Sequence, residues 1–431
     1  MRNHVSRLKQ FGGLWRHPDF LKLWAGQTVS LGGSLVSRVA LPLVAILTLD
    51  ASPGEVALLR MADLVPGIVI GLFAGVWADR LRRRPLMIWA DLGRAVLLGL
   101  IPLATVMGVL RLELLLVVVS AAGLLTALFE VAYHAYLPTL VTRDELVEGN
   151  SKLEASGAAI EVASFGLGGW LVQALTAPIA VLVDAISFLV SAACLGAIQT
   201  PEPASHDRTE PQTTWLAIRE GVRPVLHDPV LRALAGARTS LYFFIYLWLS
   251  MLLLFLTRGL GLEPVVFGVL FAVGGVCSLV GATLAERVVR RLGLGPTLIL
   301  MLFITSAELL LVPLAAGPFV LVVVLVGAQQ LADGPATIYQ IHETSLIQAT
   351  VPGRSLGRVT ASLRVVGWIA MLGGTIVGGL LGEALGPRPT MFVGAVGALP
   401  AALWLLWSPV RSLRTMPAVS EGAAGEGAAA S

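Results

Sequence analysis

The sequence has few charged residues: Asp, Glu, Lys and Arg make up 13% of its 431 residues, and lysine occurs only three times. Soluble domains carry about 25% charged residues, so this chain has too few to cover the surface of a soluble protein of its size. Hydrophobic residues make up 56% of the chain, and the mean hydropathy is +0.82. They gather in runs of roughly 20, long enough to cross a bilayer core. The composition predicts an all-α membrane protein.

Cysteine is also scarce, since Cys194 and Cys277 are the only two and both lie inside apolar runs. A disulfide framework is therefore not expected. The sequence contains no H-E-x-x-H pair of metal-binding histidines and no G-x-x-x-x-G-K phosphate loop. We predict no catalytic residue, no metal and no cofactor. His134 or His342 could act as a base in a membrane-embedded enzyme, but no nucleophile accompanies them.

Apolar runs, separated by Pro, Gly and charged residues, predict twelve transmembrane helices. They form two six-helix bundles related by pseudo-two-fold symmetry, with these ranges: 21–48, 56–78, 85–109, 113–136, 150–172 and 178–198, then 231–257, 264–285, 296–315, 318–340, 357–385 and 389–409. The predicted domains are an N-terminal bundle at 1–198, a cytoplasmic linker at 199–230, a C-terminal bundle at 231–414 and a disordered tail at 415–431.

The basic residues fix an orientation. The formal net charge is +3, and the arginines cluster in alternate breaks between apolar runs. Because basic loops stay in the cytoplasm, this pattern places both termini and the linker on the cytoplasmic side of the cell inner membrane. The basic balance is thus a signal of membrane orientation, and we expect no nucleic-acid partner.

The two predicted bundles repeat a motif. Residues 78–84 read Ala-Asp-Arg-Leu-Arg-Arg-Arg after the second span, and residues 285–291 read Ala-Glu-Arg-Val-Val-Arg-Arg after the eighth. With Gly75, the first copy resembles the G-x-x-x-D-R-x-G-R-R/K loop of the major facilitator superfamily, although Arg82 replaces the inner glycine. The resemblance implies the major facilitator fold and a loop that closes the cytoplasmic gate. Its members here are Gly75, Asp79, Arg80, Arg83, Arg84, Glu286 and Arg287. A topology signal alone is the other interpretation.

A narrower resemblance is to the drug, macrolide and siderophore exporters of that superfamily. It depends on residues 49–53, 91–94 and 137–141, followed by Asn150-Ser151. Two features of proton antiporters are missing: the proline of the G-P-x-x-G-G run in the fifth span, where residues 164–169 read Ser-Phe-Gly-Leu-Gly-Gly, and an arginine in the fourth span. These differences weaken the prediction of proton antiport more than they weaken the prediction of transport.

Ionisable side chains inside a bilayer are costly, so each needs a partner or a wet cavity. Candidates for substrate binding or proton coupling are Arg38, Asp63, Glu130, His134, Glu161 and Asp333. Arg38 and Asp63 fall at similar depths on neighbouring spans, where an ion pair and a substrate role are both open. We expect Asp91 and Arg94 to form a structural charge pair, and Asp184 and Glu308 to be structural.

The sequence therefore predicts a secondary active transporter that exports an amphipathic small molecule, such as a drug, macrolide or siderophore-like product, by alternating access and proton antiport. Its expected partners are the substrate, protons and the lipid bilayer, and the expected state is a monomer. A lysophospholipid or other lipid transporter of the same fold is the alternative, followed by a membrane-embedded enzyme. Scattered rather than ringed charges argue against a channel.

Overall fold

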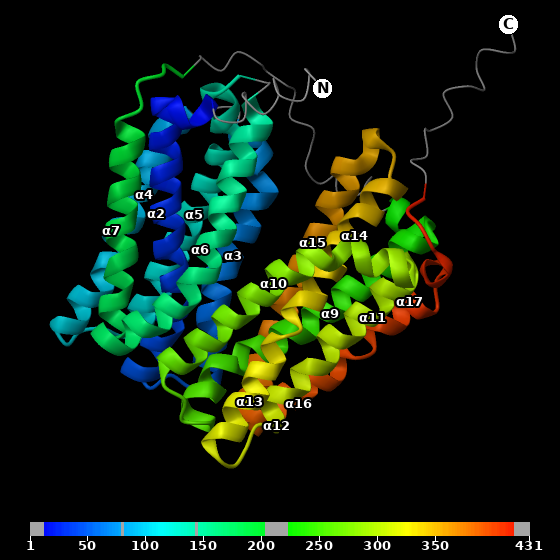
Figure 1. Ribbon diagram of the computed structural model, residues 1–431. Helices are drawn as coiled ribbons and strands as arrows, with labels where there is room; N and C mark the ends of the chain where they lie inside the picture. Colours follow the sequence, from blue (N-terminus) through cyan, green and yellow to red (C-terminus); the bar gives the residue numbers. More distant parts are fainter. Residues whose placement is uncertain (1–12, 79–81, 143–144, 203–222, 418–431) are drawn as a thin grey trace, which may run out of the picture. The chain divides into compact units, whose positions relative to one another are not determined.

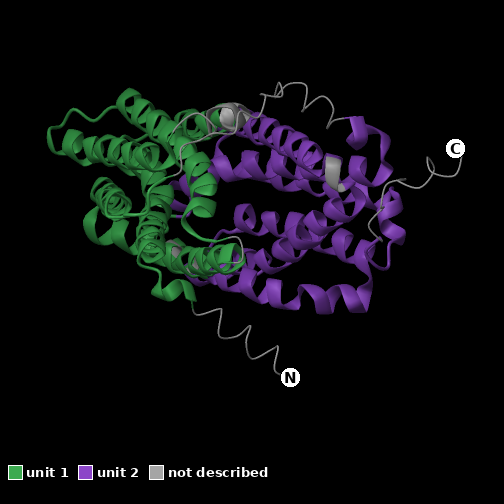
Figure 2. Ribbon diagram, turned by 90° about the horizontal axis from the view of Figure 1, so that it is seen from above, with its two compact units in different colours: residues 1–211, 261–272 green, residues 212–260, 273–431 purple. Residues whose placement is uncertain are grey.

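The computed structural model describes residues 13–78, 82–142, 145–202 and 223–417. The described residues form helices joined by short loops and contain no strand, which confirms the all-α prediction. The chain separates into two compact units (Figure 2): unit 1 holds residues 1–211 and 261–272, and unit 2 holds residues 212–260 and 273–431. The predicted domain boundaries stay predictions, and residues 203–222 of the linker and 418–431 of the tail lie outside the described residues.

The described residues of unit 1 before Pro211 form six long helices and two short helical turns, which Figure 1 draws in blue to green. Helix α2 packs against α6 and α7, α4 packs against α5 and α7, and α3 packs against α5. The elements are η1 (Gly13–Arg16), α2 (Pro18–Leu43), the π-helical turn η2 (Val44–Thr48), α3 (Pro53–Ala78), α4 (Arg83–Val106), α5 (Leu112–Leu140), α6 (Leu146–Leu175) and α7 (Ala177–Gly196).

Helices α2 and α7 approach closely because glycine lines their contact. A Cβ atom on Gly33 would lie 2.2 Å from the Ser187 Oγ, and one on Gly26 would lie 3.0 Å from the Cys194 Cβ. The two glycines are seven residues apart and so lie on one face of α2. Small residues on a shared face let membrane helices pack backbone to backbone. This contact holds the polar residues of α7 against those of α2.

Unit 2 has more interrupted helices than unit 1. Its elements are α9 (Pro229–Leu254), the π-helical turn η4 (Phe255–Gly259), α10 (Pro264–Leu292), α11 (Leu294–Ala307), η5 (Glu308–Leu310), α12 (Leu311–Leu314), α13 (Phe319–Gln330), α14 (Asp333–Thr350), α15 (Gly353–Leu385), α16 (Pro387–Ala398), α17 (Ala401–Leu406) and η6 (Pro409–Ser412). Helix α9 packs against α15, α16 and α17, and α11 packs against α14 and α17. The first residues of α10, up to Ala272, belong to unit 1.

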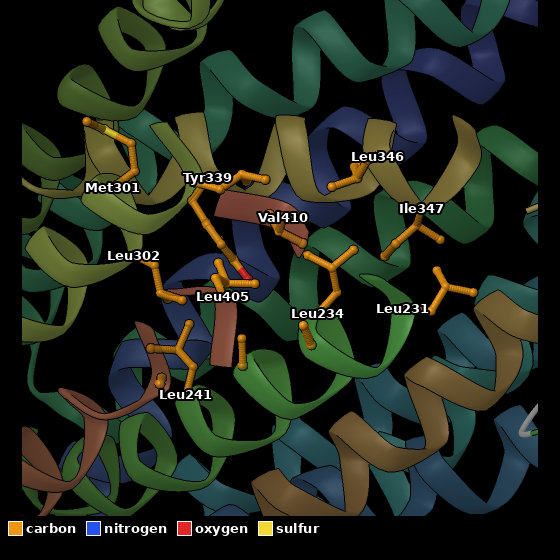
Figure 3. Close-up of a cluster of buried hydrophobic side chains, with 14 of the residues drawn as sticks. Leu231, Leu234, Leu241, Met301, Leu302, Tyr339, Leu346, Ile347, Leu405 and Val410 are labelled. Carbon is orange, nitrogen blue, oxygen red and sulfur yellow. The ribbon is translucent and has the colours of Figure 1, made fainter. Parts of the chain in front are cut away.

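The core of unit 2 is a cluster of buried apolar side chains, most of them from α9, α11, α14 and α17, with others from α10, α15 and η6 (Figure 3). Leu234 of α9, Tyr339 of α14 and Leu405 of α17 converge in it, and each is at most 5% exposed. Burying a side chain of this size stabilises the fold by about 1.5–3 kcal/mol. The cluster packs these helices of unit 2 against one another.

Ten helical segments of the described chain are long and apolar enough to cross a membrane. Helix α6, bent by 49° between its two halves, makes an eleventh candidate when counted as one span. A polytopic membrane protein is therefore confirmed, whereas the count of twelve spans and the pseudo-two-fold symmetry stay predictions.

Candidate functional site

Unit 1 encloses a cavity of about 270 Å³ between α2, α3, α4, α5 and α7. Apolar side chains such as Leu59, Leu98 and Val119 form part of its wall, and charged and hydroxyl side chains form the rest. Ligand sites combine largely apolar walls with a few polar groups that fix the ligand's orientation. The polar lining residues are Ser34, Ser37, Arg38, Arg60, Asp63, Arg94, Thr126 and Asp184.

Arg38 and Asp63, predicted to lie at similar depth, do meet in this cavity. Both side chains are exposed, and both line its wall. Asp63 interacts electrostatically with Arg60, one turn before it on α3, and with Arg38 on α2. Sequence reasoning missed Arg60, although its i, i+3 spacing from Asp63 was a usable signal. Two cations and a carboxylate thus share one wet site.

Asp184 of α7 also lines the cavity, but it is only 2% exposed. The Ser34 and Ser187 hydroxyls donate hydrogen bonds to its Oδ1 at 3.3 and 3.2 Å. The close α2–α7 contact brings its carboxylate to the cavity wall, where serine hydroxyls compensate its burial. The structural role that the sequence predicts for Asp184 stays a prediction.

Asp91 and Arg94 form the predicted charge pair, one turn apart on α4. The Asp91 Oδ1 accepts a hydrogen bond from the Arg94 Nη2, and the two residues are 0% and 4% exposed. The guanidinium lies 4.5 Å from the ring centre of Phe129 and 4.0 Å from that of Phe188. Aromatic faces attract a desolvated cation, so the two rings and the Asp91 carboxylate together stabilise the buried guanidinium. A structural role for the pair stays a prediction.

The other candidates of unit 1 lie outside the cavity wall. Glu130 and His134 are exposed on α5, and Glu161 is exposed on α6. Glu130 interacts electrostatically with Arg94. The imidazole of His134 makes an edge contact with Tyr133 at 5.5 Å between ring centres. Their roles in coupling or substrate binding stay predictions.

The predicted gating loop is described in part. Gly75 lies in α3, whereas Asp79 and Arg80 lie outside the described residues. Arg83 and Arg84 begin α4, and their backbone N–H groups donate to the Glu202 carboxylate at 2.8 and 3.2 Å. A carboxylate at a helix N-terminus satisfies free N–H groups and the helix dipole. Sequence reasoning missed Glu202, because it is distant in the chain.

Arg84 makes further contacts that hold α4 to the end of α7. Its guanidinium donates to the Leu195 and Gly196 carbonyl oxygens at 2.8 and 2.7 Å. In the equivalent segment of unit 2, Glu286 pairs with Arg290 at 3.5 Å, and Arg287 is exposed. That pair is on the surface, so it adds little stability.

Unit 2 has two buried groups of charged residues. In the first, the Arg238 Nε lies 3.7 Å from the Glu343 Oε1, and the guanidinium lies 5.5 Å from the ring centre of Tyr242. In the second, Glu308 of η5 interacts electrostatically with Asp333, the first residue of α14. Asp333 lies at the break between α13 and α14. The structural role predicted for Glu308 and the substrate or coupling role predicted for Asp333 stay predictions.

The sequence pattern of the family described as "Transmembrane secretion effector" matches residues 13–423 of the chain. The chain belongs to this family of major facilitator transporters. It is 27% identical to the "Uncharacterized MFS-type transporter YfiS" of Bacillus subtilis over 85% of its own length and 87% of that protein. It is 23% identical to "Macrolide efflux protein A" of Streptococcus pyogenes, covering 85% of this chain and 90% of that one.

Solved structures share the fold. A bacterial homologue of the iron transporter ferroportin, in an inward-facing state, matches with a TM-score of 0.74 and 19% identity, covering 90% of this chain and 98% of the other. A bacterial homologue of the human lysosomal transporter Spinster matches with a TM-score of 0.68 and 16% identity, covering 90% and 95%. These similarities show that this family member has the major facilitator fold, and fold alone does not fix the substrate.

Proposed function

We propose that this transporter exports an amphipathic small molecule, such as a macrolide, by alternating access coupled to inward proton movement. The observation that carries the proposal is the unit 1 cavity, where charged side chains stand beside apolar walls. A ligand with both a charged and an apolar part matches such a lining. The similarity to "Macrolide efflux protein A" supports the same substrate class.

Within the cavity, Asp63 is the proposed anchor for a cationic group on the substrate, and Arg38 and Arg60 balance its charge when the site is empty. A cavity of 270 Å³ is smaller than a drug-sized pocket, so it would receive the charged end of the ligand. Arg38, Asp63 and Asp184 are therefore the proposed binding residues. Glu130, His134 and Glu161 remain candidates for proton coupling.

The orientation completes the proposal. The distribution of arginine along the sequence supports a protein of the cell inner membrane with both termini in the cytoplasm. The loop at Asp79 is the proposed cytoplasmic latch. We propose that the protein works as a monomer.

Uptake of a radiolabelled macrolide into inside-out membrane vesicles tests the proposal. With a proton gradient that is acid inside, vesicles holding the protein should accumulate the label several-fold over empty vesicles, and a proton ionophore should abolish the difference. Asp63→Asn should raise the KM. Glu113→Gln is the matched control, because Glu113 is exposed in the first turn of α5 and outside the cavity.

The outcomes separate the parts of the proposal. Saturable uptake that is insensitive to the ionophore would contradict proton coupling while leaving export in place. Uptake of a labelled lysophospholipid but not of the macrolide would replace the substrate class. An unchanged KM in Asp63→Asn would remove that residue from the binding site.

A further inference from the structure

Two carboxylates of unit 2 lie where transmembrane segments lose their regular helical form. Glu308 begins the 3₁₀ turn η5 between α11 and α12, and Asp333 begins α14 after the break that follows α13. Transporters place ions at interrupted helices, because unwound backbone and polar side chains can then face a protected site inside the bilayer. Each break therefore lies at an acidic residue, Glu308 in one case and Asp333 in the other.

Glu308 is buried with an incomplete set of partners. It is 9% exposed, and its Oε2 has no hydrogen-bond partner among the described residues. One turn earlier on the same helix face, the Thr305 Oγ1 is also buried and unpartnered, in a residue that is 7% exposed. Buried polar atoms are normally satisfied, so each of these two oxygens can still take a hydrogen-bond partner.

Amide side chains connect the two acids. The Gln329 side chain interacts with Glu308, and the Gln330 Nε2 donates a hydrogen bond to the Gln329 Oε1 at 2.9 Å. A Cβ atom on Gly274 of α10 would lie 2.8 Å from the Gln330 Oε1 and 2.1 Å from the Asp333 Oδ2. Gln330 and Asp333 therefore converge on one point beside α10, and only glycine leaves room for them.

No basic side chain of the described chain pairs with either acid. Glu308 interacts electrostatically with Asp333, and the two carboxylates repel each other when both are charged. The neighbouring segments bring no compensating charge: α9 contributes the neutral Trp248, which donates to the Leu309 carbonyl at 3.0 Å. Arg388 of α16 is bound to the Pro313 carbonyl at 2.8 Å. Helix α10 contributes Cys277, whose carbonyl oxygen lies 3.0 Å from a Cβ on Gly334.

The charged groups further along α14 have their own partners. His342 contacts the Ala285 carbonyl at 3.1 Å through its Nε2, and Glu343 pairs with Arg238. Two carboxylates in one low-dielectric site cannot both stay ionised at low cost. Binding one proton removes the repulsion and adds an O–H donor for an unpartnered oxygen.

We propose that Glu308 and Asp333 form a proton-binding site in unit 2, in which one proton is held by the pair and released when the site opens to the other side of the membrane. Proton uptake forms an O–H bond on a carboxylate, and release returns that carboxylate to its anionic form. The role of this site in transport rests on the proposed proton antiport, in which its proton would be the coupling ion. Proton binding itself can be measured without any substrate.

Infrared difference spectroscopy of the reconstituted full-length protein tests the site. At neutral pH the C=O stretching band of a protonated, buried carboxyl group should be present in the wild type and lost in Glu308→Gln. In Asp333→Asn the band at neutral pH should shrink, because Glu308 no longer faces a second negative charge. Glu113→Gln, which removes an exposed acid of unit 1, should leave the band unchanged.

Two glycine-to-alanine substitutions, a test variant and its control, leave both Glu308 and Asp333 in place. Gly274→Ala places a methyl group against the Asp333 and Gln330 oxygens and should shift or split the band, whereas Gly357→Ala of α15 has no atom within 4 Å of its new Cβ and should not. Size-exclusion chromatography establishes that each variant is folded. A wild-type band that survives in Glu308→Gln would overturn the proposal. A band that disappears at constant pH when NaCl is added would also overturn it, because the site would then hold sodium.

These measurements separate the site from the transport proposal. Loss of the band in folded Glu308→Gln supports the proton site even if vesicles transport no macrolide. Ionophore-sensitive macrolide uptake with an unchanged band in that variant contradicts the proton site and leaves export intact.

Discussion

The acids of the two units are compensated in different ways. In unit 1, Asp91 bonds to Arg94, Asp63 interacts with two arginines, and Asp184 accepts from serine hydroxyls. In unit 2, Glu308 and Asp333 have amide neighbours and each other. Acids with fixed cations or hydroxyls can stay ionised and bind a charged ligand. An acid pair without a cation is suited to binding a proton.

Each unit also contains a buried arginine–carboxylate pair, and the two pairs differ in how closely the charged groups approach. Arg94 bonds directly to Asp91 and contacts two aromatic rings, while Arg238 lies 3.7 Å from Glu343 and its side chain is 19% exposed. A buried pair is costly to break because removing one partner leaves the other charge uncompensated. The two pairs should therefore respond differently to loss of the arginine.

The largest expected effect is from Arg94→Leu. It leaves the fully buried Asp91 without its cation and should destabilise the protein by about 3–5 kcal/mol. Arg238→Leu should cost less, about 1–3 kcal/mol, because that ion pair is longer and its arginine is partly hydrated. The midpoint of thermal unfolding in detergent, followed by fluorescence-detected size exclusion, measures both. Adding Asp91→Leu to Arg94→Leu should restore most of the loss. Equal losses in the two single variants would mean that the pairs are equivalent.

The next effect concerns the contact that brings Asp184 to the cavity. Gly33→Ala would place a methyl group 2.2 Å from the Ser187 Oγ and 2.7 Å from the Ser187 Cβ. Rotation of the Ser187 side chain cannot move its Cβ, so the contact between α2 and α7 must loosen. We expect a loss of about 1–3 kcal/mol. Gly32→Ala is the matched control on the same helix, since its nearest neighbour is the Ile160 Cγ2 at 3.6 Å. It should stay within about 1 kcal/mol of wild type. A neutral Gly33→Ala would show that the close contact is not required.

The smallest effect is expected for Asp184→Asn. The amide oxygen can still accept from the serine hydroxyls that hold Asp184, so the unfolding midpoint should change by less than the equivalent of about 1 kcal/mol. The same thermal assay measures it beside Arg94→Leu. A loss as large as that of Arg94→Leu would show that the charge of Asp184, rather than its hydrogen bonds, holds α2 and α7 together.

Much of the architecture could be predicted from the sequence, because membrane helices are long apolar runs with polar punctuation. Among the described residues, the ten candidate spans and the bent helix α6 each correspond to one of the predicted ranges. Depth along neighbouring antiparallel spans also predicted that Arg38 and Asp63 lie at similar levels, and both line the unit 1 cavity. Both inferences use distances along the chain alone.

The partners that sequence reasoning missed lie across packed helices. Glu202 binds the start of α4 from more than a hundred residues away, and Asp184 reaches the cavity because glycine on α2 admits α7. Gln329 and Gln330 carry no charge, so a search for ionisable groups passed over them. Side-chain packing decides which helix faces meet. The spacing of residues within one span does not predict which face of another helix it will contact.

The division of roles between the two units is tested most directly by macrolide uptake into inside-out vesicles, measured against pH for wild type, Asp63→Asn and Glu308→Gln. Asp63→Asn should raise the KM several-fold and keep the wild-type pH profile. Glu308→Gln should keep the KM and flatten the pH profile. A flattened profile in Asp63→Asn, with the wild-type profile retained in Glu308→Gln, would place proton coupling on Asp63 rather than Glu308 and contradict the account.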